Sequence, residues 1–550
     1  MQESVLIFRK KYYYERDGSQ VELQRSSLTP SLLPDDKILV NVKGEAVSLL
    51  GRQPQHAIAI VRGFNNGLCY FICPLLSPLY NPCAKAESLR IGDRVLVYIT
   101  ATEFTIITEY GSMHDRSKDW QIIDDLYSTA VAPPKRITHQ DCPLYTQPEK
   151  DQCDLQTFTI DPEGSRDFDD AISIVGNTVF IHIVDIHKHI DQDTPIDIEA
   201  ARQAFTLYLP EGNHNIIPRE KAENEWSLIA GQPRAVITIE IRFTAHDVKS
   251  YDIYKSTVIV KNRYTYENAP HMPFLAELAA ARKCNNFTIP FVKLNMDMTG
   301  NLLDTQHIYN TDESHRVIET LMILGNMLVS LHLEKYASNY IHIPQRFHTR
   351  LRDLPDTPPT GDIVIDSFLA IKSFALATYE SEKKGHFGLN LQSYTHFTSP
   401  IRRYFDVIMH RMLGGVVYEP ESLSRLLTHI NTRERHIDAL VQLHKDWKLY
   451  SKIAKGDIWD VIVTRVCSAG IYYLHKTYMI DGFIHVSKLC GKRWSFAGGV
   501  LIEQAGEGAS HAQDGAYNST TDQQCISLGT ALRCRVEKVD VASRTLILAT

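Results

Sequence analysis

Short runs of β-branched and aromatic residues, separated by turn residues, dominate the first 110 residues of the chain. These runs are ILVNV, HAIAIV, GLCYFIC and DRVLVYITATEFTIIT, and the Asn-Asn-Gly triplet at 65–67 is typical of a hairpin turn. Roughly five strands in this length predict a small β-barrel. A polar connector with Ala-Pro-Pro at 132–134 follows, and it indicates a boundary near residue 150.

The rest of the chain changes pattern twice. Residues 151–455 begin with strand-like runs and then turn helical, and residues 314–337 repeat apolar side chains at helical spacing. The last 95 residues return to strands, with a Gly/Ala/Ser/Gln-rich stretch at 495–524 that we interpret as a solvated insertion. We therefore predict a multidomain α+β protein in which a mixed α/β domain lies between all-β barrels. The predicted segments are a barrel at 1–115, a linker at 116–150, a central domain at 151–455 and a second barrel at 456–550.

Composition excludes several classes of protein. The chain has 550 residues, 44% hydrophobic and 22% charged, which is typical of a folded globular protein and not of collagen-like or low-complexity chains. The ten cysteines are scattered without a CxxC pair, which favours a reducing compartment and gives no zinc-site spacing. The N-terminal sequence has no secretory pattern, and we read no uninterrupted apolar stretch long enough for a membrane span. We expect a monomer that does not enter membranes and is located in the cytoplasm, and an organellar location stays open.

Net charge is a poor guide here, whereas its distribution is informative. The total of −7 argues mildly against a nucleic-acid-binding protein. Residues 151–200, however, hold 12 acidic and 2 basic side chains, so the other 500 residues sum to +3. Residues 341–455 hold 16 Lys/Arg against 12 Asp/Glu. One acidic block therefore lies within a neutral to mildly basic chain.

The acidic block contains four aspartates within ten residues. Its sequence predicts a strand that ends near Ile160, a loop from Asp161 to Asp170 and a hairpin that turns at Gly176-Asn177. The loop carries Asp161, Asp167, Asp169 and Asp170. Mg²⁺ prefers carboxylate oxygens together with substrate phosphate, and such ions activate water for phosphodiester hydrolysis. The spacing alone leaves three interpretations open: a catalytic metal site, a structural calcium site, and a solvated acidic loop.

A second segment, residues 383–415, predicts a helix with arginines at its start. Ser399 suits the N-cap, Pro400 suits the first helical position, and Gly414-Gly415 suits the end. Arg402 and Arg403 then lie in the first turn, where cations oppose the helix dipole. A bound phosphate would compensate them. The alternative is that both arginines pair with nearby acidic side chains.

Five motifs together resemble one family of nucleases. The motifs IDPEGSRDFDDA, HIVDI, YLP, YTYEN and GHFGLNLQSYTHFTSPIRRYFD occur in the order found in the ribonuclease II and ribonuclease R family, the RNB exoribonucleases. The similarity runs from about residue 150 to 455. The C-terminal strands resemble an RNA-binding OB fold of the ribosomal-protein type, and the N-terminal strands loosely resemble a cold-shock-type OB fold.

The resemblance implies processive, metal-dependent hydrolysis of single-stranded RNA from its 3′ end, which releases nucleoside 5′-monophosphates. It implies one or two Mg²⁺ ions, with Mn²⁺ as a substitute, held by Asp161, Asp167, Asp169 and Asp170, of which Asp169 is the most sensitive position. Arg402 resembles the arginine that grips the phosphate at the cleavage site, and Arg403 would contribute to substrate binding. Tyr208 resembles the aromatic residue that stacks on the terminal base, and Tyr266 resembles the residue near the ribose.

The sequence departs from the family pattern at His187-Lys188, Trp226 and Val441, none of which is among the aspartates or Arg402. Two other functions stay open. One is an RNA-binding protein with weak or no hydrolytic activity, which the presence of all four aspartates disfavours. The other is a hydrolase of small phosphoesters, which would leave the two barrels without a purpose.

Overall fold

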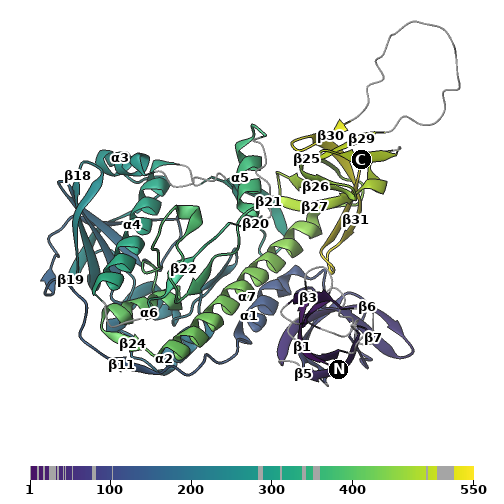
Figure 1. Cartoon of the computed structure of the whole chain (residues 1–550), viewed down its shortest axis with the longest axis horizontal. Coiled ribbons are helices and arrows are strands. Elements are labelled where there is room, and N and C mark those ends of the chain that lie inside the picture. Colours follow the sequence, from purple (N-terminus) through teal and green to yellow (C-terminus); the bar gives the residue numbers. More distant parts are fainter. Residues whose placement is uncertain are drawn as a thin grey trace, which may run out of the picture. The chain divides into compact units, whose positions relative to one another are not determined.

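The computed structural model describes most of the chain and resolves it into two compact units. The residues outside the description are 1, 9–11, 17–18, 24–32, 34–35, 41–42, 44, 52–53, 77–81, 102, 283–288, 310–311, 337–341, 351–359, 491–492 and 504–524. Unit 1 consists of residues 1–129, 292–307 and 439–550, and unit 2 consists of residues 130–291 and 308–438. Each unit therefore combines segments that are distant in the sequence (Figure 1).

Unit 1 begins with two antiparallel sheets of five strands each, where the sequence pattern indicates one small barrel. The first sheet has the order β3-β2-β1-β4-β5, and the second has the order β10-β9-β6-β7-β8. Their bounds are β1 Gln2–Phe8, β2 Tyr12–Arg16, β3 Ser19–Glu22, β4 Lys37–Val40, β5 Ala46–Gly51, β6 Gln55–Asn65, β7 Leu68–Ile72, β8 Cys83–Ala84, β9 Asp93–Ile99 and β10 Phe104–Ser112. The predicted hairpin turn is confirmed, because Asn66 and Gly67 between β6 and β7 have φ of 50° and 74°.

The C-terminal part of unit 1 contains the five strands that the sequence predicts. They form a sheet of order β27-β26-β25-β31-β32, and β27 also lies beside β32, so the sheet nearly closes, as in OB-like domains. The bounds are β25 Ile458–Cys467, β26 Gly470–His475, β27 Ile480–His485, β31 Ala531–Asp540 and β32 Thr545–Ala549. The predicted insertion at 495–524 is wrong at its start. Strands β28 (Trp494–Ala497) and β29 (Val500–Glu503) form a hairpin, whereas residues 504–524 lie outside the described residues.

Unit 2 is built on a mixed sheet that closes on itself. Its order is β12-β19-β13-β14-β15-β18, with β19 pairing also to β18. The long strand β19 pairs antiparallel with β18 through its first residues and parallel with β13 through its last ones. The bounds are β12 Lys150–Asp151, β13 Thr157–Asp161, β14 Asp170–Val175, β15 Thr178–Val184, β18 Pro233–Thr244 and β19 Asp247–Thr265. The hairpin at 176–177 is confirmed, since Val175 pairs with Thr178.

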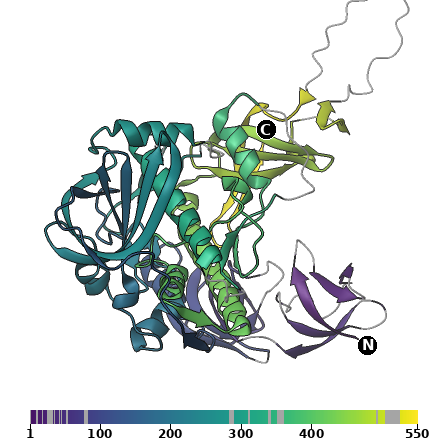
Figure 2. The same cartoon turned by 60° about the vertical axis from the view of Figure 1, so that its left-hand side comes forward.

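The predicted central helix is confirmed as α4, Glu313–Tyr336, and it packs against this sheet (Figures 1 and 2). A Cβ at Gly325 would lie 3.4 Å from the Cδ1 atoms of Ile181 and Ile239, so the glycine allows close approach. By length and composition, residues 313–335 could also span a bilayer, although core helices pass the same test; 67% of that window is buried in the structure. The other helices are α1 Asp119–Ser128, α2 Pro195–Gln203, α3 Pro273–Ala281, α5 Ile363–Lys372, α6 Tyr404–Leu413 and α7 Pro420–Lys452.

The predicted start of the arginine helix is wrong. Helix α6 begins at Tyr404 with Arg403 at its N-cap, not at Pro400, and it ends at Leu413 with Gly414 as its C-cap, in agreement with the predicted end. Arg403 instead forms a β-bridge with Phe205, and the Tyr404 N–H donates to the carbonyl of Ala204 at 2.8 Å. A tertiary partner, the segment after α2, therefore supplies the hydrogen bonds that a first helical turn would otherwise contain. All ten residues of α6 are buried, so the helix lies inside unit 2 and not on its surface.

Candidate active site

The aspartate loop opens into a cavity of about 1030 Å³ in unit 2. Asp161 is the last residue of β13 and Asp170 is the first residue of β14, so the two strands present their carboxylates at one edge of the sheet. The cavity is lined by three of the predicted aspartates and by all four other predicted residues: Asp161, Asp167, Asp170, Tyr208, Tyr266, Arg402 and Arg403. The fold therefore brings together side chains that are as many as 242 positions apart in the sequence.

Asp169 lies behind the cavity and joins the loop to the arginine segment. Its side chain is 3% exposed. The Ile401 N–H donates to Asp169 Oδ1 at 2.7 Å, and Arg402 Nε lies 3.3 Å from Asp169 Oδ2. Asp169 thus fixes the position of the turn that carries Arg402, and unlike the other three aspartates it does not line the cavity.

Asp167 is held by one of the predicted substrate residues. Tyr208 lies in the short strand β16 (Leu207–Leu209), is 41% exposed, and donates its hydroxyl to Asp167 Oδ2 at 2.6 Å. Between the two acidic positions, Phe168 is buried, and its N–H donates to Ser227 Oγ at 2.8 Å. The buried Phe168 and Asp169 lie between the partly buried Asp167 and Asp170, and hydrogen bonds from Tyr208 and from backbone N–H groups hold this stretch in place although its like charges repel one another.

Burial and mutual repulsion make these carboxylates reluctant to ionise. Desolvation and the neighbouring Asp169 raise the pKa of Asp161 to about 7, while Arg263 and Arg402 oppose the shift. Desolvation and Asp161 raise the pKa of Asp170 to about 7, again against Arg402. Desolvation also raises the pKa of Asp169 well above its usual range, although Arg402 and the Ile401 N–H favour its charged form. Paired carboxylates with raised pKa values are typical of functional sites.

The donor set suits a hard cation. Mg²⁺ takes oxygen ligands, and the buried Oδ2 atoms of Asp161 and Asp169 accept no hydrogen bond. Among the described residues, no group of three His, Cys, Asp or Glu side chains lies close enough together to hold a metal ion. The hydrogen bonds above account for this, because Asp167 is directed to Tyr208 and Asp169 to Arg402. A bound cation would have to draw these carboxylates together, and it would remove the repulsion that raises their pKa values.

The two arginines have different partners. Arg402 is 42% exposed, and its Nη2 donates to Ser399 Oγ at 2.7 Å, so its guanidinium is available to an anion in the cavity. Arg403 is 16% exposed and pairs with the buried Asp406 at 2.8 Å. Asp406 also accepts the Ser399 N–H at 2.8 Å. Arg403 therefore pairs with a nearby acidic side chain, which is the alternative that the sequence left open for the two arginines.

Tyr266 lines the cavity next to a residue that the motifs did not indicate. Its ring stacks on His315 with 3.6 Å between ring centroids and an interplanar angle of 11°. His315 belongs to α4, as do two other polar residues that line the cavity, Glu319 and Asn326. Asn326 Oδ1 accepts the backbone N–H of Phe397 at 2.8 Å, so α4 also supports the segment that leads to Arg402. The sequence pattern predicts α4 as a core helix, because its apolar periodicity indicates a buried face. Periodicity does not show which cavity the polar residues of the helix reach.

Of the departures from the family motifs, His187, Lys188 and Trp226 lie in unit 2 and Val441 lies in unit 1. Trp226 is 2% exposed and stacks on His189 with 5.3 Å between centroids. Lys188 is exposed, whereas His187 and Val441 are partly buried. None of these residues lines the cavity among the described residues.

Comparisons with known proteins assign the region that holds this cavity to a known domain family. The sequence matches the RNB domain family over residues 149–283 and 271–419. It is 27% identical over 413 residues to ribonuclease R of Aquifex aeolicus, covering 62% of this chain and 58% of that protein. It is also 24% identical over 474 residues to ribonuclease R of Escherichia coli, covering 71% of this chain and 56% of that protein. The chain thus spans slightly under six tenths of these two curated relatives.

Solved structures share the fold over almost the whole chain. Mycoplasma genitalium RNase R in complex with ribose methylated single-stranded RNA superposes with a TM-score of 0.77 at 18% identity, covering 100% of both chains. The same protein in complex with double-stranded RNA has a TM-score of 0.68 at 18% identity, covering 96% of this chain and 100% of that one. Yeast Ssd1, described as a pseudonuclease, has a TM-score of 0.66 at 16% identity and covers 92% of this chain and 82% of that one. The match to the RNB domain family and the distant similarity to bacterial ribonuclease R over most of the chain show that the chain carries an RNB domain and belongs to the ribonuclease II/ribonuclease R family.

Proposed function

We propose that this protein is a metal-dependent exoribonuclease that degrades single-stranded RNA processively from the 3′ end to nucleoside 5′-monophosphates. The observation that carries the proposal is the cavity in which Asp161, Asp167 and Asp170 lie together with Arg402. Phosphodiester hydrolysis needs both a cation site for the attacking water and a positive group for the phosphate. The two OB-like parts of unit 1 would then bind the RNA strand through stacking and charge.

In this proposal Asp161, Asp167, Asp169 and Asp170 hold Mg²⁺, as one or two ions, with Mn²⁺ as a substitute. When bound, the metal supplies a water molecule activated at neutral pH and offsets phosphate charge. Arg402 binds the scissile phosphate with its exposed guanidinium and offsets the negative charge that grows in the transition state. Asp169 also positions this arginine, since both contact each other in the buried wall of the site.

The remaining predicted residues bind the end of the RNA. Tyr208 presents its half-exposed ring for stacking on the terminal base, and its hydroxyl must release Asp167 when that carboxylate turns to the metal. In this proposal Tyr266 contacts the ribose near its 2′-hydroxyl, and the stacking of its ring on His315 supports this role because it fixes the plane of the ring. Arg403 contributes to substrate binding from the cavity wall, where an ion pair with Asp406 holds its guanidinium in place.

A second candidate function is RNA binding with weak or no hydrolysis. Two observations favour it: the pseudonuclease Ssd1 shares the fold, and no three metal-binding side chains converge among the described residues. The presence of all four aspartates opposes it. The two functions differ in whether Mg²⁺ produces cleavage, so one assay separates them.

The test uses purified full-length protein, Mg²⁺ and a 5′-labelled single-stranded RNA. We expect a ladder that shortens from the 3′ end to a short final product, and no reaction in EDTA. Asp169→Asn should abolish cleavage and leave RNA binding, measured by filter retention in EDTA, within about twofold of the parent. Binding without cleavage by the parent in Mg²⁺ and in Mn²⁺ would establish the second function. Cleavage by Asp169→Asn at the parent's rate would show that the metal-site assignment is wrong.

A further inference from the structure

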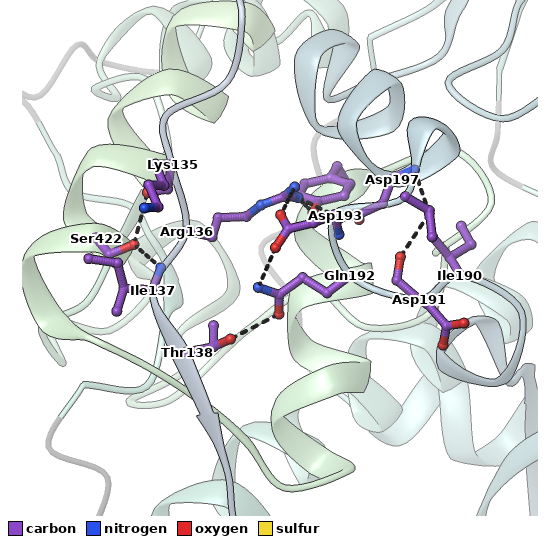
Figure 3. A network of polar contacts seen from close by, with 12 residues as sticks. Lys135, Arg136, Ile137, Thr138, Ile190, Asp191, Gln192, Asp193, Asp197 and Ser422 are labelled. Carbon is purple, nitrogen blue, oxygen red and sulfur yellow. Dashed lines mark hydrogen bonds and ion pairs between the residues drawn. The ribbon is translucent and has the colours of Figure 1, made fainter.

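The connector that precedes the RNB region is attached to unit 2 along its length. Residues 130–138 lie before residue 149, where the family match begins. The Ile137 N–H donates to Ser422 Oγ at 2.9 Å, and that hydroxyl donates to the carbonyl of Lys135 at 3.2 Å. Thr138 Oγ1 donates to Gln192 Oε1 at 3.1 Å (Figure 3). Between these anchors, the Arg136 side chain extends into the interior of unit 2, and the whole residue is 7% exposed.

Arg136 meets a fully buried carboxylate at the start of α2. Its Nη1 lies 2.8 Å from Asp197 Oδ2, and its Nη2 lies 2.8 Å from Asp193 Oδ1 (Figure 3). Asp197 is 0% exposed and also binds Arg411 Nη2 at 2.7 Å through Oδ1. Two arginines thus face two aspartates, so the network is neutral as a whole. The Asp193 side chain is 62% exposed, so the buried carboxylate that the arginines share is Asp197, and removal of Arg136 takes away one of its two cationic partners.

The network is centred on the hydroxyl of Tyr404, the first residue of α6. This hydroxyl donates to Asp197 Oδ1 at 2.8 Å and accepts from Arg411 Nη1 at 3.0 Å. It also accepts a short hydrogen bond from Arg136 Nη1. A tyrosine hydroxyl has one donor and two acceptor positions, and all three are used here. Tyr404 is 0% exposed, so water cannot replace a lost partner.

Tyr404 directly follows the arginines of the candidate active site. Its N–H is bonded to the carbonyl of Ala204, which has a φ of +64°, and the carbonyl of Arg402 accepts the Thr206 N–H at 3.0 Å. Helix α2 therefore contacts the segment 402–404 at two places. Asp197 in its first turn binds the Tyr404 hydroxyl, and the residues just after its last turn bind the backbone of that segment. The held segment is the one whose guanidinium reaches Asp169.

We propose that Arg136, although it lies outside the region that matches the RNB family, is a positioning residue for Arg402 and acts through the Tyr404 hydroxyl. This inference rests on the proposed nuclease function. Loss of the Arg136 hydrogen bond lets the Tyr404 ring and the turn before it shift. A displacement of about 1 Å at a phosphate-binding group costs about 10²-fold in rate. RNA affinity changes little, because it is distributed over many phosphate and base contacts.

The test compares Arg136→Met, which keeps the length of the side chain and removes its donors, with Ser422→Ala. The control variant breaks the neighbouring anchor of the connector and leaves the Arg136 contacts intact. With labelled RNA and Mg²⁺, we expect Arg136→Met to lower the single-turnover rate about tenfold or more and to change the RNA Kd by less than about twofold. Ser422→Ala should keep both within about twofold. Equal rates for Arg136→Met and the parent would overturn the inference.

The route through Tyr404 has its own test. Because both side chains act through one hydroxyl, Arg136→Met should cause no further loss of rate in a Tyr404→Phe background. Multiplied losses in the double variant would show that Arg136 acts by another route. If Arg136→Met fails to fold, Arg136→Lys replaces it, since this change keeps a charge for Asp197 but cannot contact two partners as a fork, and the same loss of rate is expected.

A measurement without activity separates this inference from the proposed function. Hydrogen exchange of the peptide spanning residues 399–406 should accelerate in Arg136→Met and stay at the parent's rate in Ser422→Ala. Unchanged exchange in both variants would overturn the inference. If the parent itself does not cleave RNA, the proposed function fails, and the exchange result still decides whether Arg136 positions this segment.

Discussion

Asp161 and Asp170 should make the metal-free protein less stable as the pH rises. Each has a pKa raised from 3.8 to about 7, by desolvation first and by the other carboxylates second. Between about pH 4 and pH 7 the folded state therefore holds protons that the unfolded state has already lost. The free energy of unfolding falls with increasing pH through this window and becomes level above it. A rise of this size in one pKa corresponds to about 4 kcal/mol, which is an upper limit because the two groups share their repulsion.

Asp170→Asn tests this reasoning because an amide of the same shape carries no charge. In EDTA we expect the variant to exceed the parent in free energy of unfolding by about 2–4 kcal/mol at pH 8 and to equal it near pH 4. Hydrogen-exchange protection of the β13–β15 amides at several pH values measures this quantity within unit 2. Asp247→Asn, an exposed aspartate at the start of β19, is the matched control and should have no effect at either pH. Added Mg²⁺ should stabilise the parent at pH 8 and act more weakly on Asp170→Asn.

The pH dependence of the free energy of unfolding in EDTA can also contradict this prediction. If the parent's stability in EDTA stays level or rises between pH 4 and pH 8 relative to Asp170→Asn, the two carboxylates ionise freely in the folded protein. The cavity would then be too well hydrated for a repelling carboxylate pair, and no cation would be needed to relieve it.

Three further predictions address the site and its support. Arg402→Lys keeps a charge but loses the guanidinium fork, and it should slow single-turnover cleavage by about 10²-fold with RNA binding little changed; a rate within about threefold of the parent would remove Arg402 from the cleavage step. Tyr266→Ala should reduce the preference for RNA over DNA in cleavage of matched oligonucleotides, and an unchanged ratio would remove Tyr266 from the site. Gly415→Ala should lower the free energy of unfolding by about 1–3 kcal/mol or more, because Gly415 has a φ of +91° and an added Cβ would collide with the carbonyl oxygen of Asp141. Gly231→Ala, where φ is +80° and the space is open, serves as its control in thermal unfolding, and equal losses in both variants would mean that φ alone is responsible.

Local signals predicted those elements whose partners are close in the sequence. The hairpin at 66–67 and the hairpin at 176–177 follow from turn chemistry, and α4 follows from apolar periodicity. In the N-terminal region the strand pattern predicts one barrel, whereas the structure has two five-stranded sheets. Strand patterns show that strands exist, whereas the division of strands between sheets depends on pairings across longer distances.

The start of α6 shows the same limit within the site. Ser399-Pro400 is a good local signal for a helix start, but the segment after α2 provides competing hydrogen bonds to the Arg402 carbonyl and the Tyr404 N–H. That competition involves residues about 200 positions away in the chain. A local sequence pattern therefore cannot predict this competition for hydrogen bonds.

The sequence by itself determined the chemistry of this protein: four aspartates in one loop, an arginine pair, and motifs that identify an RNB domain. These features are encoded in residue types and short spacings, so they can be read before the chain is folded. Only the tertiary structure decided how the groups are used. It directs Asp169 to Ile401 and Arg402 across 232 positions, assigns Arg403 to Asp406, and brings Arg136 of the connector to Tyr404. The physical reason is that a buried charge or hydroxyl must be satisfied by whichever partner the packed core places beside it, and that partner is set by the fold and not by proximity in the sequence.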